Sequence, residues 1–100
     1  MGKVTVRVLL KAFKALGNET RLKVLATLLT RGEMTVTQIA RQLSMSHSRV
    51  SRNLGILETN NFVKNRQSKR WVYYSIKYEK DSPQALHLIV LLRKELKGRK

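Results

Sequence analysis

Residues 39–57 read IARQLSMSHSRVSRNLGIL, a stretch in which serines and arginines are flanked by apolar residues at helical spacing. When Val50 is taken as the centre of an apolar face, with about 100° of rotation per residue, Leu54 and Leu57 lie within about 40° of it. Arg52 falls on the opposite side of the same helix. We therefore predict a helix with one buried and one polar face here, although the composition alone is typical of a loop.

A tight turn, LSMS at residues 43–46, joins this helix to a shorter one that precedes it. Ser46 is predicted to cap the second helix, because a serine oxygen accepts a backbone N–H of the first turn. Thr35 and Gln38 have the spacing of a capping box and are predicted to open the first. Residues 36–57 thus have the layout of a helix-turn-helix.

Two further helices are predicted before this unit. Apolar residues recur at helical spacing from Val6 to Leu16, and Gly17 ends that helix. Asn18 is the predicted N-cap of the next helix, which closes at Gly32. The alternating valines near the start of the chain also fit a short strand, so a strand-like opening stays open as an alternative.

After the helix-turn-helix, residues 62–76 contain two runs of β-favouring residues, FVKNRQ and RWVYYSI, joined by polar and basic residues. They predict a hairpin with a charged tip. Strand alternation is expected to pack Trp71 and one tyrosine against the helices, while stacking of these rings on bases is the alternative. Residues 82–97 form a last, unusually apolar helix. The predicted fold is mainly α with a β-hairpin, in one domain spanning residues 1–100.

The charge balance favours a polyanionic partner. The chain has 21 Lys and Arg against 6 Asp and Glu, a net charge of +15, and the basic residues are spread along its length. Such a balance on a soluble chain is typical of nucleic-acid binding, and an anionic membrane surface is the weaker alternative. We predict no membrane association.

Several other classes of function are not expected. There is no Cys, which excludes disulfides and thiolate metal ligands. The sequence shows no phosphate-binding glycine loop, catalytic carboxylate pair or activated nucleophile, so we predict no enzyme, no catalytic residues and no cofactor. No signal peptide is evident and the apolar run at residues 88–92 is too short to span a bilayer, so a cytoplasmic location is expected.

Three blocks of the sequence, FKALGNETRLKVLATLL, IARQLSMSHSRVSRNLGIL and FVKNRQSKRWVYYSI, resemble consecutive blocks of the ArsR/SmtB family of winged helix-turn-helix transcriptional repressors. The resemblance covers about residues 12–78. It implies a homodimer held by the first and last helices, residues 1–16 and 82–97. The residues we expect in that dimer interface are Leu9, Phe13, Leu86, Ile89, Val90, Leu92 and Leu96.

The resemblance also implies that the fourth helix reads the major groove of DNA. The recognition residues are then Ser46, His47, Ser48, Arg49, Ser51 and Arg52, and those of the wing are Lys64, Arg66, Lys69 and Arg70. Because arginine can bind guanine through two hydrogen bonds, Arg52 is our first candidate for base readout, with Arg49 on a phosphate or a base.

Metal sensing, common in this family, is not predicted. The positions that match the family's thiolate site hold Thr35 and Thr37, which lack sulfur. The last helix offers only Asp81 and His87, too few ligands for a tight site, so we interpret His87 as a packed or interface residue.

The sequence therefore predicts a homodimeric, sequence-specific repressor that binds a palindromic operator in double-stranded DNA and does not respond to metals. It identifies no small-molecule effector. The alternatives are a non-specific or architectural DNA-binding protein, favoured by the high charge, and a protein-interaction module that uses the apolar last helix.

Overall fold

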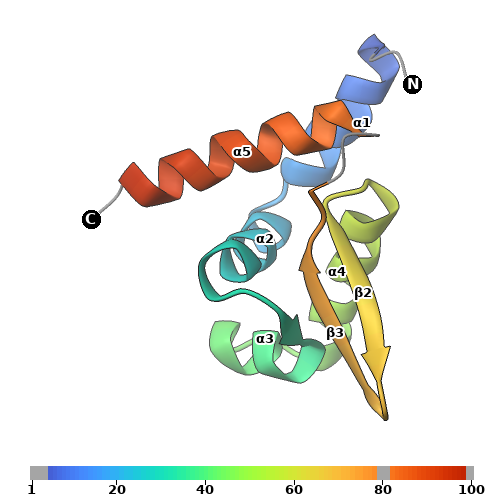
Figure 1. The fold of residues 1–100 in the computed structure, drawn as a ribbon, viewed down its shortest axis with the longest axis vertical. Coiled ribbons are helices and arrows are strands. Elements are labelled where there is room, and N and C mark those ends of the chain that lie inside the picture. Colours follow the sequence, from blue (N-terminus) through green and yellow to red (C-terminus); the bar gives the residue numbers. More distant parts are fainter. Residues whose placement is uncertain (1–4, 79–81, 99–100) are drawn as a thin grey trace.

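The computed structural model of the protein describes residues 5–78 and 82–98 and has a winged helix-turn-helix fold (Figure 1). The predicted order of four helices, a hairpin and a last helix is confirmed, and one short strand is added to it. The elements are α1 (Val6–Leu16), α2 (Glu19–Arg31), β1 (Met34–Thr35), α3 (Val36–Leu43), α4 (His47–Thr59), β2 (Val63–Ser68), β3 (Trp71–Ile76) and α5 (Pro83–Gly98).

Local capping explains where α2, α3 and α4 begin. The Asn18 side chain accepts a hydrogen bond from the N–H of the third helical residue of α2, and Ser46 does the same for α4. Thr35 and Gln38 form both bonds of the predicted capping box, at 3.2 and 2.9 Å. Thr5 caps α1, so the described valines are helical, and residues 1–4 lie outside the described part of the chain.

The core lies between the helices and the inner face of the hairpin. Val50, Leu54 and Leu57 of α4 are fully buried, as their spacing predicts, and pack with apolar residues of α2 and α3. Ile89 of α5 is also fully buried, with 0% of its surface exposed. Its predicted place in a dimer interface is therefore wrong, because this side chain is already enclosed within the protomer.

The three strands form an antiparallel sheet in the order β1-β3-β2. In β3, Tyr74 and Ile76 face the core, which places the alternate residues on the outer face. Trp71 is 46% exposed, so the prediction that it packs inward is wrong, whereas the prediction for one tyrosine is confirmed. Lys69 and Arg70 alone separate the strands, and Lys69 adopts the left-handed conformation with φ of 58°.

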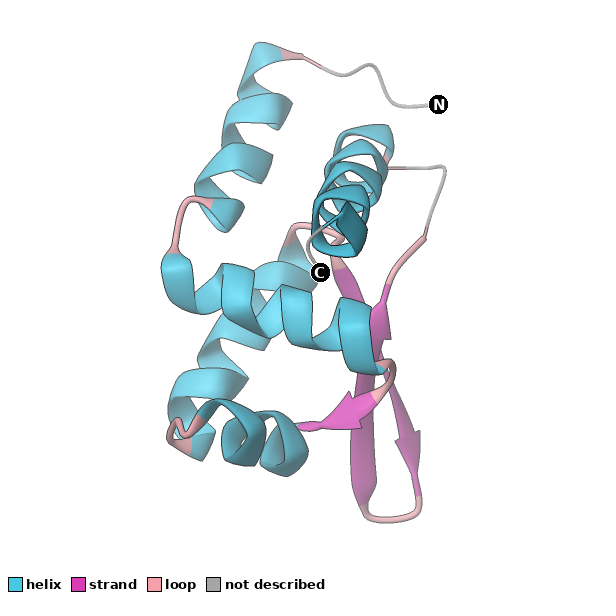
Figure 2. Ribbon diagram, turned by 90° about the vertical axis from the view of Figure 1, so that its left-hand side faces the viewer, coloured by secondary structure: helices cyan, strands magenta, loops and turns pink. Residues whose placement is uncertain are grey.

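The elements divide between two ends of the molecule. Figure 1 and Figure 2 show α1 and α5 at one end, and α3 with the tip of the hairpin at the other. The surface predicted to meet DNA is thus separated from the surface predicted to meet a second copy.

Within residues 5–78 and 82–98, every helix is too short or too polar to traverse a lipid bilayer.

Candidate nucleic-acid interface

Helix α4 presents a polar face to solvent because its other face is fixed in the core. His47, Ser48, Ser51 and Arg52 are all exposed, and Ser46 immediately precedes them as the N-cap. Serine side chains are short, so they leave room for the backbone of a helix to approach base edges in the major groove. The structure therefore brings together the residues predicted for recognition on one accessible helix face.

The two arginines of this helix differ in their surroundings. Arg49 donates a hydrogen bond from Nη2 to the Thr20 hydroxyl of α2, at 2.8 Å. The Arg52 side chain makes no hydrogen bond or ion pair with any part of the chain that the structure describes. Arg52 is thus available to a ligand, whereas Arg49 is held against the neighbouring helix.

A buried polar residue that we did not predict orients α4. Asn53 is only 8% exposed; its amide nitrogen donates to the Arg49 carbonyl and its oxygen accepts from Arg21 Nη1, at 2.8 and 3.4 Å. Arg21 in turn donates to the carbonyls of Lys14 and Ala15 at the end of α1. The helical position of Asn53, about 60° from Val50, is the signal that could have revealed this link.

In the wing, Lys64, Arg66, Lys69 and Arg70 are exposed as predicted, but Arg66 is already engaged. Its Nε and Nη2 donate to the two oxygens of Glu33 at 2.7 and 2.8 Å, and its guanidinium carbon lies 4.8 Å from the centroid of the Tyr73 ring. This hydrogen bonding lowers the pKa of Glu33 and raises the pKa of Arg66. Arg66 therefore serves the wing's own structure.

The tip of the wing carries the cations that remain available. The Arg70 guanidinium carbon lies 5.6 Å from the centroid of the Trp71 ring, which still leaves its donors free for a ligand. The Lys69 side chain has no polar partner within residues 5–78 and 82–98. Asn65, further back on β2, donates to Glu58 of α4 and so links the base of the wing to the recognition helix.

A cleft of about 350 Å³ lies between the wing tip, the start of α3 and the start of α4. His47 and Ser51 of α4 line it together with Arg70 of the wing, which are residues predicted from separate parts of the sequence. Thr37 of α3 also lines it. Sequence reasoning considered Thr37 only as a position that lacks a metal ligand, so its place beside the recognition helix was missed.

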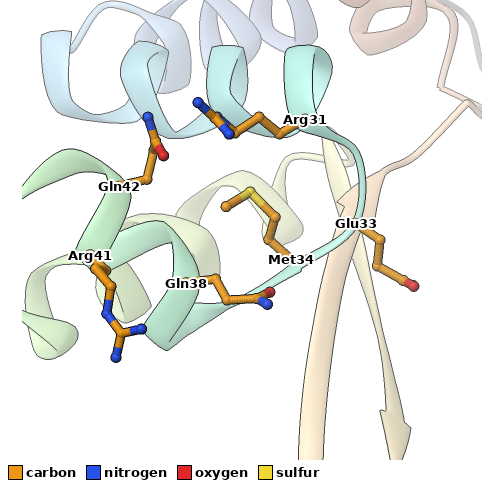
Figure 3. Close-up of a pocket in the computed structure, with 6 residues that line it drawn as sticks. All are labelled: Arg31, Glu33, Met34, Gln38, Arg41 and Gln42. Atoms are coloured by element: carbon orange, nitrogen blue, oxygen red, sulfur yellow. The ribbon is translucent and has the colours of Figure 1, made fainter.

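A second depression, of about 480 Å³, lies beside α3 and contains two arginines (Figure 3). Arg31 and Arg41 line it with two glutamines and Met34, while the Glu33 side chain points away from the other labelled residues. Small-molecule sites are usually apolar and enclosed. The polar lining of this depression is not of that kind.

Apolar side chains are exposed at the opposite end of the molecule. Phe13 is 55% exposed and Val90 is 41% exposed, and the predicted interface residues Leu9, Leu86, Leu92 and Leu96 are partly exposed. Val6, Leu10 and Leu91 are exposed as well, although the predicted interface set does not include them. Val6, Leu10 and Phe13 follow one another at four and three residues, so they form a continuous exposed stripe on α1.

The described residues contain no group of three or more His, Cys, Asp or Glu side chains that could hold a metal ion. His87 is exposed on α5, and Asp81 lies outside the described residues.

Residues 16–66 match the model of a helix-turn-helix domain family. Over 67 residues the chain is 33% identical to the arsenic resistance transcriptional regulator ArsR2 of Pseudomonas putida and 31% identical to the arsenical resistance operon repressor of Escherichia coli. Each match covers 67% of this chain, but only 58% and 57% of those relatives, respectively.

An uncharacterized HTH-type transcriptional regulator of Methanocaldococcus jannaschii is 38% identical over 64 residues, which cover 64% of this chain and 72% of that protein. Among solved structures, HlyU from Vibrio cholerae superposes with a TM-score of 0.74 at 27% identity, covering 89% of this chain and 91% of that one. A homodimeric winged helix-turn-helix DNA-binding domain from Mycobacterium bovis, a possible ArsR-family regulator, gives 0.72 at 27% identity, covering 97% and 91%.

Proposed function

Because the chain belongs to the ArsR/SmtB family of winged helix-turn-helix transcriptional repressors, we propose that it represses transcription by binding a specific site in double-stranded DNA. The observation that carries the proposal is the exposed polar face of α4, with an unpaired Arg52, beside a wing whose tip bears Lys69 and Arg70. The net charge of +15 supplies the attraction to phosphates.

The cations have different roles in this proposal. Arg52 reads a base edge, since a bidentate arginine–guanine contact discriminates by about 1–3 kcal/mol. Lys64, Lys69 and Arg70 bind phosphates, while His47, Ser48 and Ser51 line the groove-facing surface. Arg66 and Arg49 act mainly as positioning residues, because their guanidinium groups are held by Glu33 and Thr20.

The functional unit in this proposal is a homodimer. The exposed stripe of Val6, Leu10 and Phe13 on α1 and the exposed Val90 and Leu91 on α5 are the surfaces that a second copy would cover. Two recognition helices related by a two-fold axis then require an imperfect palindrome with half-sites about 10–10.5 bp apart, or a multiple of that.

The proposed repressor does not respond to metals through a family-type thiolate site. The chain has no Cys, and Thr35 and Thr37 occupy the positions that resemble that site. Thr35 also uses its hydroxyl to accept a hydrogen bond from Gln38 in the capping box. Neither threonine supplies the soft ligand that such a site needs.

Selection of bound fragments from the source genome tests the proposal directly. We expect one recurring palindromic sequence, bound at least about 10³-fold more tightly than random duplex at physiological salt. A smaller ratio would favour an architectural DNA-binding protein. A chain that sediments as a monomer and retains no DNA at low salt would leave the protein-interaction module as the better reading.

A further inference from the structure

The cleft between the wing and the recognition helix joins three segments that are far apart in the sequence. Thr37 comes from the first turn of α3, His47 and Ser51 come from α4, and Arg70 comes from the tip of the wing. Val72 of β3 forms part of its wall. The volume of the cleft is about 350 Å³.

The chemistry of the cleft suits an anion with an apolar portion. The described residues that line it include no Asp or Glu, whereas Arg70 contributes a positive charge. The hydroxyls of Thr37 and Ser51 make no hydrogen bond within the described parts of the chain. Free hydroxyl donors and a guanidinium group are the side chains that bind phosphate oxygens, and an apolar wall suits a deoxyribose.

We propose that this cleft holds one phosphodiester of a DNA strand, with its deoxyribose against Val72. Thr37 and Ser51 donate to the phosphate from one side and Arg70 donates from the other. The strand then passes between α4 and the wing, and Thr37 of α3 becomes a DNA contact. The proposal rests on the proposed DNA-binding function and adds a defined phosphate site to it.

Two side chains that bind the same phosphate contribute to DNA affinity in a coupled way, whereas independent contacts contribute additively. We expect Thr37→Val to weaken binding of specific and random duplex alike by about tenfold, because a hydrogen bond to a charged group is lost. Arg70→Gln should reduce by about one the steepness with which the logarithm of the binding constant falls with the logarithm of the salt concentration, which we call the salt slope. The fold-loss of DNA affinity in the double variant should be smaller than the product of the fold-losses in the two single variants, since groups that bind one phosphate are coupled.

Thr30→Val is the matched control for Thr37→Val. Thr30 is an exposed threonine of α2 whose hydroxyl donates to the Ala26 carbonyl, and it does not line the cleft. Its substitution should leave DNA affinity unchanged. Circular dichroism and thermal melting of all variants would establish that each one is folded before binding is compared.

Duplexes with a single neutral methylphosphonate locate the phosphate. At one position of each half-site, the neutral linkage should weaken DNA binding by the unaltered protein. On that duplex, Thr37→Val and Arg70→Gln should cause little further loss of affinity. Strictly additive losses, or the absence of any such position, would overturn the shared site.

Trp71, the only tryptophan of the chain, lines the same cleft and provides an independent readout. Its emission should change when duplex is added, with the same midpoint as the anisotropy of labelled DNA. The anisotropy could report tight DNA binding while Thr37→Val leaves the affinity unchanged and duplex leaves the Trp71 emission unchanged. That result would overturn the phosphate site, and the DNA-binding function would stand. If the unaltered chain binds no duplex, both proposals fail.

Discussion

Arg66 of β2 holds Glu33, the residue just before β1, across the full width of the sheet. The register places Arg66 opposite Tyr73 on the central strand, and Tyr73 in turn opposite Thr35 of β1. The guanidinium group lies over the Tyr73 ring and reaches both oxygens of the Glu33 carboxylate. The wing is therefore fixed to the helical body by a charged contact as well as by the strand ladder.

Double-mutant analysis of Glu33→Gln and Arg66→Gln should detect coupling between the two side chains at neutral pH and low salt. The hydrogen bond from Arg66 holds the pKa of Glu33 below its ordinary value of 4.5. The stabilisation is thus complete above pH 4.5 and is lost as the pH falls through the lower value of the folded state. Denaturant titrations at neutral and acidic pH measure it.

Solvent exposure limits this coupling, so the pair Glu19 and Lys23 on α2 is the suitable control. That pair is also exposed, at 3.2 Å, and makes neither the bidentate contact nor the stacking on an aromatic ring. Its coupling should be smaller than that of Glu33 and Arg66. Equal coupling in the two cycles would argue against any special role of the sheet-spanning contact.

Arg52→Ala and Lys69→Asn should affect DNA binding in different ways. Arg52→Ala is expected to remove about 1–3 kcal/mol of discrimination at one base-pair position. Lys69→Asn should weaken all sequences alike and lower the salt slope by about one, while asparagine tolerates the left-handed conformation of the turn. Competition binding with single-base operator variants at several salt concentrations separates the two effects.

Arg49→Ala is a matched comparison for Arg52→Ala, because the two arginines share a helix but differ in their partners. Arg49 contacts Thr20, so its loss should change discrimination less than the loss of Arg52. A uniform loss on specific and random DNA for Arg52→Ala would contradict its assignment to base readout.

The predictable parts of the fold depend on short-range patterns. Thr35 and Ser46 each cap a helix through a residue three positions later, so the sequence contains the whole signal. The two-residue strand β1 has no such signal, because Met34 and Thr35 form a strand only through their pairing with Tyr74 and Tyr73 of β3. Tertiary pairing, and not local preference, creates this strand.

The facing of individual side chains was harder to predict than the elements themselves. Successive side chains of a strand point to opposite faces of the sheet, so Trp71 and Tyr74 of β3 lie on different faces. The sequence does not indicate which of the two faces the core. Helix α5 is apolar on most of its circumference, so periodicity does not separate the buried Ile89 from the exposed Leu91. In both cases the packing partner decides the outcome.

The contact between Arg21 and Asn53 should matter for folding more than for direct DNA contact. Arg21→Lys keeps the charge but loses the guanidinium geometry that serves Asn53 and two carbonyls of α1, so it should cost about 1–3 kcal/mol of unfolding free energy. Urea denaturation measures this loss. Exposed Lys23→Arg on the same helix is the control and should change stability by less than about 0.5 kcal/mol.

Ile89→Ala and Leu91→Ala, two residues apart on α5, should separate folding from self-association. Ile89 is fully buried, and truncation of such a side chain costs about 2–5 kcal/mol through lost burial and the cavity left behind. Its effect should appear at every protein concentration. Leu91 is 63% exposed, so its truncation should barely change the stability of the isolated protomer and should instead weaken the dimer.

Sedimentation equilibrium, together with thermal melting over a range of protein concentrations, distinguishes these effects. For Leu91→Ala we expect a larger dimer dissociation constant and weaker binding to a two-half-site operator, while a single half-site is bound as before. For Ile89→Ala we expect a lower melting temperature that does not recover as the concentration rises. If Leu91→Ala left the association unchanged, the exposed face of α5 would not be part of the dimer interface.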